Sequence, residues 1–374
     1  MSIAAKTFIR RFEEFCPLWL AEEGDPVGLH IGTLDKSVKR IMMTLDVRPE
    51  VVAEAVAKQV DLIVAKHPPI FRPIKRLTSD DPQNAMYMTL VKHDIAVYAA
   101  HTNMDIIHDG LNDWFCEMLG IQVDDYMTRT HVEGLKKLVV YVPKAAAEKM
   151  RLALGAAGAG QQGNYQDTSY TMFGEGRFTP TKAAQPLIGH AEVPETVEEA
   201  RIEVIFPEKK QGEVLKAMFA VHPYEEPAYD LLSLDNDPVT YGIGRVGNLA
   251  QLLAIEDFCQ QVKKVFDLDG LRLVEPQQDA KKMVQRIAIC GGSGGNFYLD
   301  ALAKKADVYL TGDVYYHTAH DMQAHGLTVI DPGHNIERVC IPRFIDKMEA
   351  WKKEQNWDVE FIASETNTNP FQYR

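Results

Sequence analysis

Residues 60–68, VDLIVAKHP, contain a short unbroken run of apolar residues that ends in a lysine and a histidine. Such a run is typical of a strand buried on both faces of a parallel sheet. Helices are predicted on either side, over residues 48–59 and 82–94, and another strand is predicted over residues 95–105. This alternation of strands and helices predicts a parallel α/β sheet.

The same alternation continues outward in both directions. Before the first segment, an amphipathic helix is predicted over about residues 3–20 and a strand over 39–47; beyond it, a helix is predicted over 110–120. In the last third of the chain the predicted strands are 285–290, 307–313, 327–331 and 359–363, and the predicted helices are 296–306, 315–326 and 334–354. Residues 1–134 and 248–374 are therefore expected to form one discontinuous α/β domain.

Residues 135–247 have a different order of elements. The predicted strands are 135–143, 170–180, 200–207 and 228–234, and the predicted helices are 145–154 and 211–221. The resulting order, β-α-β-β-α-β, is that of a ferredoxin-like unit and is complete in itself. We therefore expect a ferredoxin-like domain inserted into the α/β domain.

The composition is that of a folded protein. The chain has 374 residues, of which 46% are hydrophobic and 25% charged, with a net charge of -13. This charge disfavours nucleic acid and anionic membranes as partners. The five cysteines form no C-x-x-C pair, the N-terminal stretch lacks the apolar run of a signal peptide, and no segment approaches the ~20 apolar residues of a membrane span. A cytoplasmic location is expected.

Side chains that can carry chemistry gather after the carboxyl ends of the predicted strands. They are His67, His101, Asp105, Asp313, His317, Asp331, His334 and Glu337. Ligands bind at this edge of open parallel sheets, so residues distant in sequence are expected to converge on one crevice. A single Asp or His at a strand end is more often a helix cap or a turn residue, but recurrence at four strands favours a site.

His334 and Glu337 give the sharpest local signal, because a spacing of three at the start of a helix puts both side chains within reach of one ion. With His67 and Asp105 they form a nitrogen and oxygen ligand set that suits zinc, iron or manganese, and not a thiolate-rich structural zinc site. A carboxylate such as Glu337 can bridge two metal ions that activate water for hydrolysis.

Three further motifs carry weaker signals. The segment GGSGG is predicted to offer backbone N–H groups to an anion, with an ordinary tight turn as the alternative; its residues are Gly291, Gly292, Ser293, Gly294 and Gly295. Asp313 and His317 are predicted to handle protons or to support a metal ligand, with helix capping by Asp313 as the alternative. Residues 222–227, HPYEEP, are either a contact surface or a rigid Pro-bounded loop.

Six motifs, in order along the chain, resemble those of the dinuclear-metal proteins known as GTP cyclohydrolase type II homologues. They are GDPVGLHIG (24–32), DLIVAKHPPIF (61–71), YAAHTNMD (98–105), CGGSGG (290–295), ADVYLTGDVYYH (306–317) and DPGHNIE (331–337). The resemblance implies an α/β domain that assembles into a toroidal homohexamer with metal pairs facing its interior. The segments GAGQQGNY, GEGRFTP, HPYEEPAYD and GIGRVG resemble the PII/CutA-like insert of longer members.

The resemblance implies metal ligands at His67, Asp105, His334 and Glu337, with Glu337 as the bridge. One position departs from the family, which usually has two adjacent histidines where this chain has Lys66 and His67. Because an ammonium group has no lone pair to give to a metal, the second site is expected to be weaker, empty, or completed by water or a residue such as His101. Lys66 is alternatively predicted to hold a substrate phosphate or carboxylate.

These observations favour a metal-dependent hydrolase of the cyclohydrolase or phosphoesterase type, acting on a nucleotide-like or small phosphorylated substrate. One or two divalent ions per chain are expected, zinc foremost and iron or manganese as alternatives, with His101, His317 and Asp313 handling protons. The competing class is a non-catalytic scaffold or regulator whose inserted domain binds a small molecule or a partner, and Lys66 favours it. Nucleic-acid processing inside a ring would require a locally basic cavity.

Overall fold

The computed structural model describes residues 2–276 and 282–372. The chain divides into two compact units, Met1–His131 with Tyr241–Arg374, and Val132–Thr240. Both flanks of the chain thus fold together, and the predicted α/β fold class is confirmed. The limits of the two units fall a few residues before the predicted limits at 135 and 247, and the independence of the middle domain stays a prediction.

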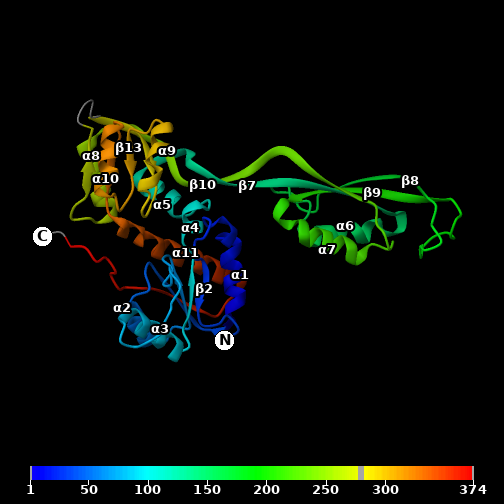
Figure 1. The fold of residues 1–374 in the computed structure, drawn as a ribbon, viewed down its shortest axis with the longest axis horizontal. Helices are drawn as coiled ribbons and strands as arrows, with labels where there is room; N and C mark the ends of the chain where they lie inside the picture. Colours follow the sequence, from blue (N-terminus) through cyan, green and yellow to red (C-terminus); the bar gives the residue numbers. More distant parts are fainter. Residues whose placement is uncertain (1, 277–281, 373–374) are drawn as a thin grey trace. The chain divides into compact units, whose positions relative to one another are not determined.

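The first sheet of the first unit has the strand order β15-β4-β5-β6-β2. Figure 1 labels its edge strand β2. Its strands are β15 (Glu360–Ala363), β4 (Arg40–Thr44), β5 (Leu62–Ala65), β6 (Ala96–Ala99) and β2 (Gly28–Ile31). The first four run parallel and β2 runs antiparallel to β6. Every residue of β5 and β6 is buried, as the apolar run predicts for strands covered on both faces.

Alternate residues of these strands face two different cores. Met42, Ile63 and Val97 pack with helices α2 (Pro49–Ala57) and α3 (Pro82–Lys92). Residues of the opposite parity, such as Met43 and Val64, pack with α1 (Ala5–Phe15) and α11 (Cys340–Gln355). The sheet is therefore a layer between helices on both faces.

The second sheet of this unit contains three parallel strands in the order β14-β13-β12, flanked by antiparallel β11 and β10. The bounds are β11 (Arg272–Val274), β14 (Thr328–Asp331), β13 (Val308–Leu310), β12 (Met283–Ile289) and β10 (Tyr229–Ala254). Helices α9 (Tyr298–Ala303) and α10 (Tyr316–Ala324) pack on one face, and α5 (Leu111–Leu119) and α8 (Ile255–Phe266) on the other.

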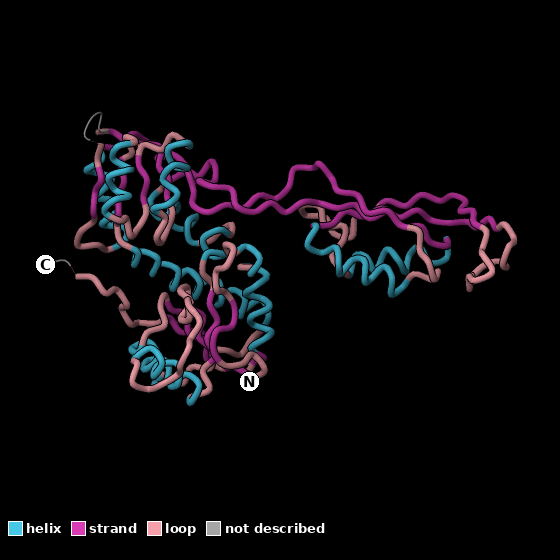
Figure 2. The backbone as a smooth tube through the Cα atoms, in the orientation of Figure 1, coloured by secondary structure: helices cyan, strands magenta, loops and turns pink. Residues whose placement is uncertain are grey.

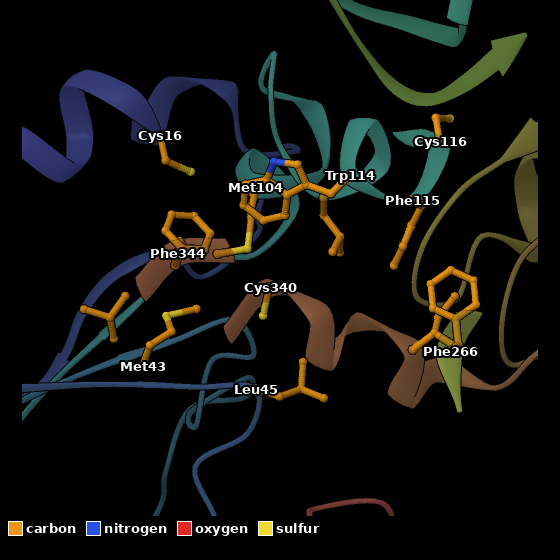
Figure 3. Close-up of a cluster of buried hydrophobic side chains, with 14 of the residues drawn as sticks. Cys16, Met43, Leu45, Met104, Trp114, Phe115, Cys116, Phe266, Cys340 and Phe344 are labelled. Atoms are coloured by element: carbon orange, nitrogen blue, oxygen red, sulfur yellow. The ribbon is translucent and has the colours of Figure 1, made fainter. Parts of the chain in front are cut away.

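One hydrophobic core is shared by these two larger sheets of the first unit. Figure 3 shows part of it, where Cys340 and Phe344 of α11 lie near Met43 of β4 and Trp114 of α5. Ile287 and Leu310 of the second sheet belong to the same buried cluster. This shared core fixes the two sheets against each other, so the carboxyl ends of strands from both can contribute to one site.

The second unit follows the order β7 (Ile121–Pro143), α6 (Ala147–Ala156), β8 (Tyr170–Phe178), β9 (Glu195–Pro207), α7 (Gln211–Val221), β10. The strands β7 and β10 carry the chain between the units. The sheet order is β10-β7-β9-β8, and Figure 2 shows both helices on one face of it. Leu138, Met150 and Met218 belong to its core. The PII/CutA-like character of this unit stays a prediction.

The loop at 222–227 is tied to its own unit. His222 Nε2 lies 2.9 Å from the backbone oxygen of Tyr141, and the Tyr224 hydroxyl donates to Glu199 Oε1 at 2.9 Å. These contacts favour the rigid-loop interpretation of HPYEEP over a free contact surface.

Several local features differ from the sequence prediction. The predicted strand 95–105 ends at Ala99, and helix α4 (Thr102–Ile106) follows it. The helix predicted over 296–306 is shorter, since a 3-10 turn at Gly295–Phe297 precedes α9. The helix predicted from residue 334 begins as a 3-10 turn, His334–Val339, before α11. Helix α8 and the strands β1 (Ile3–Ala4), β2, β3 (Ser37–Val38) and β11 were not predicted. Strands β7 and β10 extend well beyond the strands predicted at 135–143 and 228–234.

All five cysteines are buried and free. No helix in the described part of the chain combines the length and apolar character needed to cross a membrane.

Candidate metal centre

Three donor groups from the two sheets converge in the first unit. His67 follows β5, and His334 and Glu337 lie on the 3-10 turn after β14. One ligand atom from each lies within 4.8 Å of the others. Side chains three residues apart eclipse in a 3-10 helix, and His334 Nε2 accordingly lies 3.2 Å from Glu337 Oε2. The 3-10 geometry therefore aligns the pair that the sequence singles out.

Both imidazoles face the same carboxylate oxygen. His67 Nε2 lies 2.7 Å from Glu337 Oε2 and 3.2 Å from His334 Nε2. Glu337 is almost fully buried, whereas the two histidines are partly exposed. Two imidazole nitrogens and one carboxylate are the donor set of many catalytic zinc sites, which leave a coordination position for water.

A carboxylate holds the far side of each imidazole. His67 Nδ1 donates to Asp46 Oδ1, and His334 Nδ1 donates to Asp313 Oδ2, each at 2.7 Å. Such bonds fix the ring so that Nε2 points to the centre, as in carboxylate–histidine–metal arrangements. Asp313 therefore supports His334 and does not cap α10, whose N-terminus has no side-chain cap.

The histidines and Glu337 perturb one another strongly. Burial lowers the pKa of His334, but hydrogen bonds to Asp313 and Glu337 outweigh it and raise the pKa to about 10. Burial likewise opposes the raised pKa of His67, which its bonds to Asp46 and Glu337 produce. Burial would raise the pKa of Glu337, yet Lys66 and the histidines hold it well below its usual range. The raised pKa values favour protonated histidines in the metal-free form, so a metal ion must displace these protons when it binds.

Asp105 lies beside this group and bonds to Lys66. Lys66 Nζ lies 3.0 Å from Asp105 Oδ2 and 3.6 Å from Glu337 Oε1, and all three side chains are buried. Within the described residues, the buried atoms Asp105 Oδ1 and Glu337 Oε1 have no hydrogen-bond partner. Of the four predicted ligands, His67, His334 and Glu337 thus form one group, and Asp105 faces the lysine.

The glycine loop packs directly on Glu337. A Cβ atom added at Gly291 or Gly292 would lie 3.1 or 3.0 Å from Glu337 Oε1, which is closer than ordinary contact. Gly292 also has a φ of +64°, a conformation that favours glycine. Close approach to the carboxylate is therefore one reason for glycine in this loop.

Two N–H groups of the loop are used within the protein. The Gly291 N–H donates to Asn112 Oδ1 and the Gly294 N–H donates to Thr311 Oγ1, both at 2.9 Å. These two groups are not directed to an anion, and anion binding by Gly291–Gly295 stays a prediction.

A cavity of about 570 Å³ opens beside the centre. It is lined in part by Lys66, His101, Asp105, Ser293, His334 and Glu337. His101 Nδ1 donates to Asp25 Oδ1 at 2.7 Å, and the ring centroid of His101 lies 5.8 Å from that of His67. The structure thus brings His101 into the cavity next to the candidate metal ligands.

His317 and Asp331 lie apart from this cavity. His317 is exposed on α10, where its ring contacts Tyr316. Asp331 accepts the N–H groups of Val314 and Gly333 at 3.0 and 2.9 Å, so it shapes the turns that carry Asp313 and His334.

A second cavity, of about 880 Å³, also reaches the centre. His67, Asp313, His334 and residues 367–372 of the C-terminal segment line it. Thr368 donates to the other oxygen of Asp46, which holds His67. The C-terminal segment therefore contacts the support of one candidate ligand.

Asp25 and Asp46 were not predicted as site residues. Asp46 follows β4 at the same edge of the sheet as His67, but the predicted strand ran to residue 47 and so included Asp46. Asp25 lies in the motif GDPVGLHIG, but nothing in its spacing indicates a bond to His101.

Comparisons with known proteins agree with this fold and with the resemblance drawn from the motifs. A protein of Bacillus subtilis (strain 168) named "GTP cyclohydrolase 1 type 2 homolog" is 43% identical over 372 residues, which are 100% of this chain and 99% of the relative. A relative of the same name from Halalkalibacterium halodurans is 41% identical and is covered over 100% of both chains.

Solved structures match over the same length. The crystal structure of a Bacillus cereus protein related to NIF3 has a TM-score of 0.87 at 40% identity and covers 99% of each chain. Staphylococcus aureus protein SA1388 has a TM-score of 0.78 at 27% identity and covers 100% of this chain and 99% of its own. Residues 3–370 match the family described as Duf34/NIF3 (NGG1p interacting factor 3), and the chain belongs to this family.

Proposed function

We propose that the protein is a cytosolic metal-dependent hydrolase whose ion is held by His67, His334 and Glu337. The observation that carries the proposal is the convergence of three donors within 4.8 Å, next to a cavity of about 570 Å³. The donor set favours zinc, with iron or manganese as alternatives. The name of the relatives, GTP cyclohydrolase 1 type 2 homolog, supports a nucleotide-like or other small phosphorylated substrate.

A divalent ion at this place would supply Lewis acidity and lower the pKa of a water molecule. The chain's own residues would orient the substrate and move protons. Since His101 lines the cavity with Nδ1 held by Asp25, we assign the transfer of protons at Nε2 to His101. Asp313 acts by holding His334 in place. Ser293, which lines the cavity, and the loop N–H groups other than those of Gly291 and Gly294 would contact an anionic group of the substrate. His317 receives no role.

Assembly into a homohexamer belongs to this proposal. It is supported by the family resemblance, in which metal centres face the interior of a ring. Sedimentation or light scattering of the intact chain tests it, and a monomer would remove this part of the proposal while leaving the metal site in place.

A non-catalytic regulator is the second candidate. A cavity of about 450 Å³ within the second unit favours it, because Phe178, Leu187 and Tyr224 give that cavity an apolar lining beside Glu225. A small molecule bound there, with no turnover at the metal centre, is the result that this candidate predicts.

A substrate panel separates the two candidates. Metal-loaded wild-type protein is assayed on nucleotides and phosphoesters beside Glu337→Gln and the control Glu354→Gln, which changes an exposed glutamate at the end of α11. If the protein is the proposed hydrolase, the wild type and the control should show metal-dependent turnover, and Glu337→Gln should show only background turnover. Tight binding of a panel compound with no turnover in any variant supports the regulator.

A further inference from the structure

We infer that the Lys66 ammonium group occupies the position of a second metal ion, so that each chain carries a mononuclear centre with a built-in cation. This inference rests on the proposed metal site of His67, His334 and Glu337. It concerns the ion count of that site and the residue that sets it.

The two oxygens of Glu337 face different partners. Oε2 lies 2.7 Å from His67 Nε2 and 3.2 Å from His334 Nε2, on the side of the candidate ion. Oε1 lies 3.6 Å from Lys66 Nζ. A carboxylate that bridges two metal ions divides its oxygens in this way. Glu337 therefore has the geometry of a bridge between one metal ion and one ammonium group.

Asp105 is the second carboxylate that contacts Lys66. Its Oδ2 lies 3.0 Å from Lys66 Nζ, so the ammonium sits between two carboxylates that come from different elements. The other oxygen of Asp105 and Oε1 of Glu337 are buried and have no hydrogen-bond partner among the described residues. Two carboxylates with unused oxygens around one small cation form the environment that a metal ion would otherwise occupy.

Charge and burial exclude a second metal ion from the position of the Lys66 ammonium group. Lys66 is only 1% exposed, and buried carboxylates need a nearby positive charge. The ammonium supplies that charge without a lone pair, so it can neither ligate an ion nor leave room for one. A second divalent ion between Asp105 and Glu337 would meet a cation of like charge at contact distance.

The loop of residues Gly291–Gly295 limits the remaining space around the carboxylate of Glu337. The Cβ positions of Gly291 and Gly292 come within 3.1 and 3.0 Å of Glu337 Oε1, the oxygen that faces Lys66. The surroundings of this oxygen are therefore shared between the lysine and the loop backbone. Lys66 also lines the cavity of about 570 Å³, so the built-in charge is next to the space for substrate.

Metal counting tests the inference on the intact chain. Wild type, Lys66→His and Lys66→Met are loaded with Mn²⁺, freed of excess ion and measured by elemental analysis and electron paramagnetic resonance. We expect about one ion per chain in the wild type, with the resolved hyperfine lines of an isolated Mn²⁺. We expect about two in Lys66→His, with the spin coupling of ions about 3.5–4 Å apart.

Lys66→Met is the matched control, because it removes the ammonium and adds no metal ligand of comparable strength. It is expected to hold its second ion at least about tenfold more weakly than Lys66→His, because only the imidazole is a good donor at this position. Two coupled ions in the wild type overturn the inference, and so does a folded Lys66→His that stays at one ion. If Lys66→His does not fold, the wild-type spectrum decides alone.

The same measurements separate this inference from the proposed function. A wild-type protein that binds no metal would contradict the proposed metal centre itself. One ion without turnover on any substrate removes the hydrolase and leaves the role of Lys66 standing. Two ions per chain together with turnover would contradict only the inference about Lys66.

Discussion

His67 Nε2 lies 2.7 Å from Glu337 Oε2, although 270 positions separate the two residues in the chain. The contact joins the carboxyl end of β5 in one sheet to the turn after β14 in the other. It depends on the shared core around α11, since that core holds both sheets together. The candidate centre is therefore a product of sheet packing, and changes at either residue should affect metal content first.

Glu337→Gln is expected to abolish metal retention and to lower the free energy of unfolding by about 1–3 kcal/mol. The destabilisation is partial because Lys66 keeps Asp105 as a partner. His334→Ala should also abolish metal retention, with a smaller effect on stability, since His334 is partly exposed. Elemental analysis and denaturant unfolding check both. Full metal content in either variant would contradict the ligand assignment.

Asp46→Asn and Asp313→Asn are expected to weaken metal binding by about 10–100-fold, because each carboxylate orients one imidazole. Competition with a chelator of known affinity measures the change. Asp269→Asn, at an exposed position, is the control and should leave affinity unchanged. Equal affinities in all three variants would show that the imidazoles do not need these partners.

Metal binding and metal-free stability are expected to depend on pH in opposite directions. The pKa of His334 is raised from 6.5 to about 10 in the metal-free fold. Its stabilising contribution is therefore complete below pH 6.5 and is lost as the pH rises through 10. Metal affinity should rise over the same range, because the ion competes with a proton.

Thermal unfolding and metal titrations between pH 6.5 and pH 10 check this linkage, with His334→Gln as the reference. In His334→Gln, the loss of metal-free stability over this range should be smaller than in the wild type. Identical slopes in both proteins would exclude His334 as the titrating group.

Gly292→Ala is expected to destabilise the fold and weaken metal binding, because the new Cβ would press on Glu337 Oε1. Gly326 offers a matched control, since it has a φ of +77° and open space around its Cβ position. Gly326→Ala should cost about 1–2 kcal/mol from backbone strain alone and leave metal affinity intact. Equal effects of the two substitutions on metal affinity would rule out the contact with Glu337.

Deletion of residues 132–240, with a short linker in their place, is expected to leave a folded core that binds metal. The first unit has its own hydrophobic clusters, and all the candidate ligands belong to it. Circular dichroism, cooperative unfolding and metal content check this expectation. An insoluble product, or one without metal, would show that the first unit depends on the second.

Local sequence was sufficient for most of the secondary structure and for part of the site. The apolar run before His67 identified a strand buried on both faces, because solvent exposure would require polar alternation. The spacing of His334 and Glu337 identified their pairing, because one helical turn brings such residues together whatever the rest of the chain does. The place of His67 after a strand added it to this pair, and the family resemblance implied the same ligand. The relatives confirm the family.

Tertiary structure decided what lies beside these residues. The pairing of β15 with β4, the bond of Asp46 to His67, and the contact of Lys66 with two carboxylates all join segments distant in the chain. The sequence raised the question of Lys66 but left its partner open. Only packing brings Asp105 and Glu337 around its ammonium group, because the direction of a buried side chain depends on the elements that cover it.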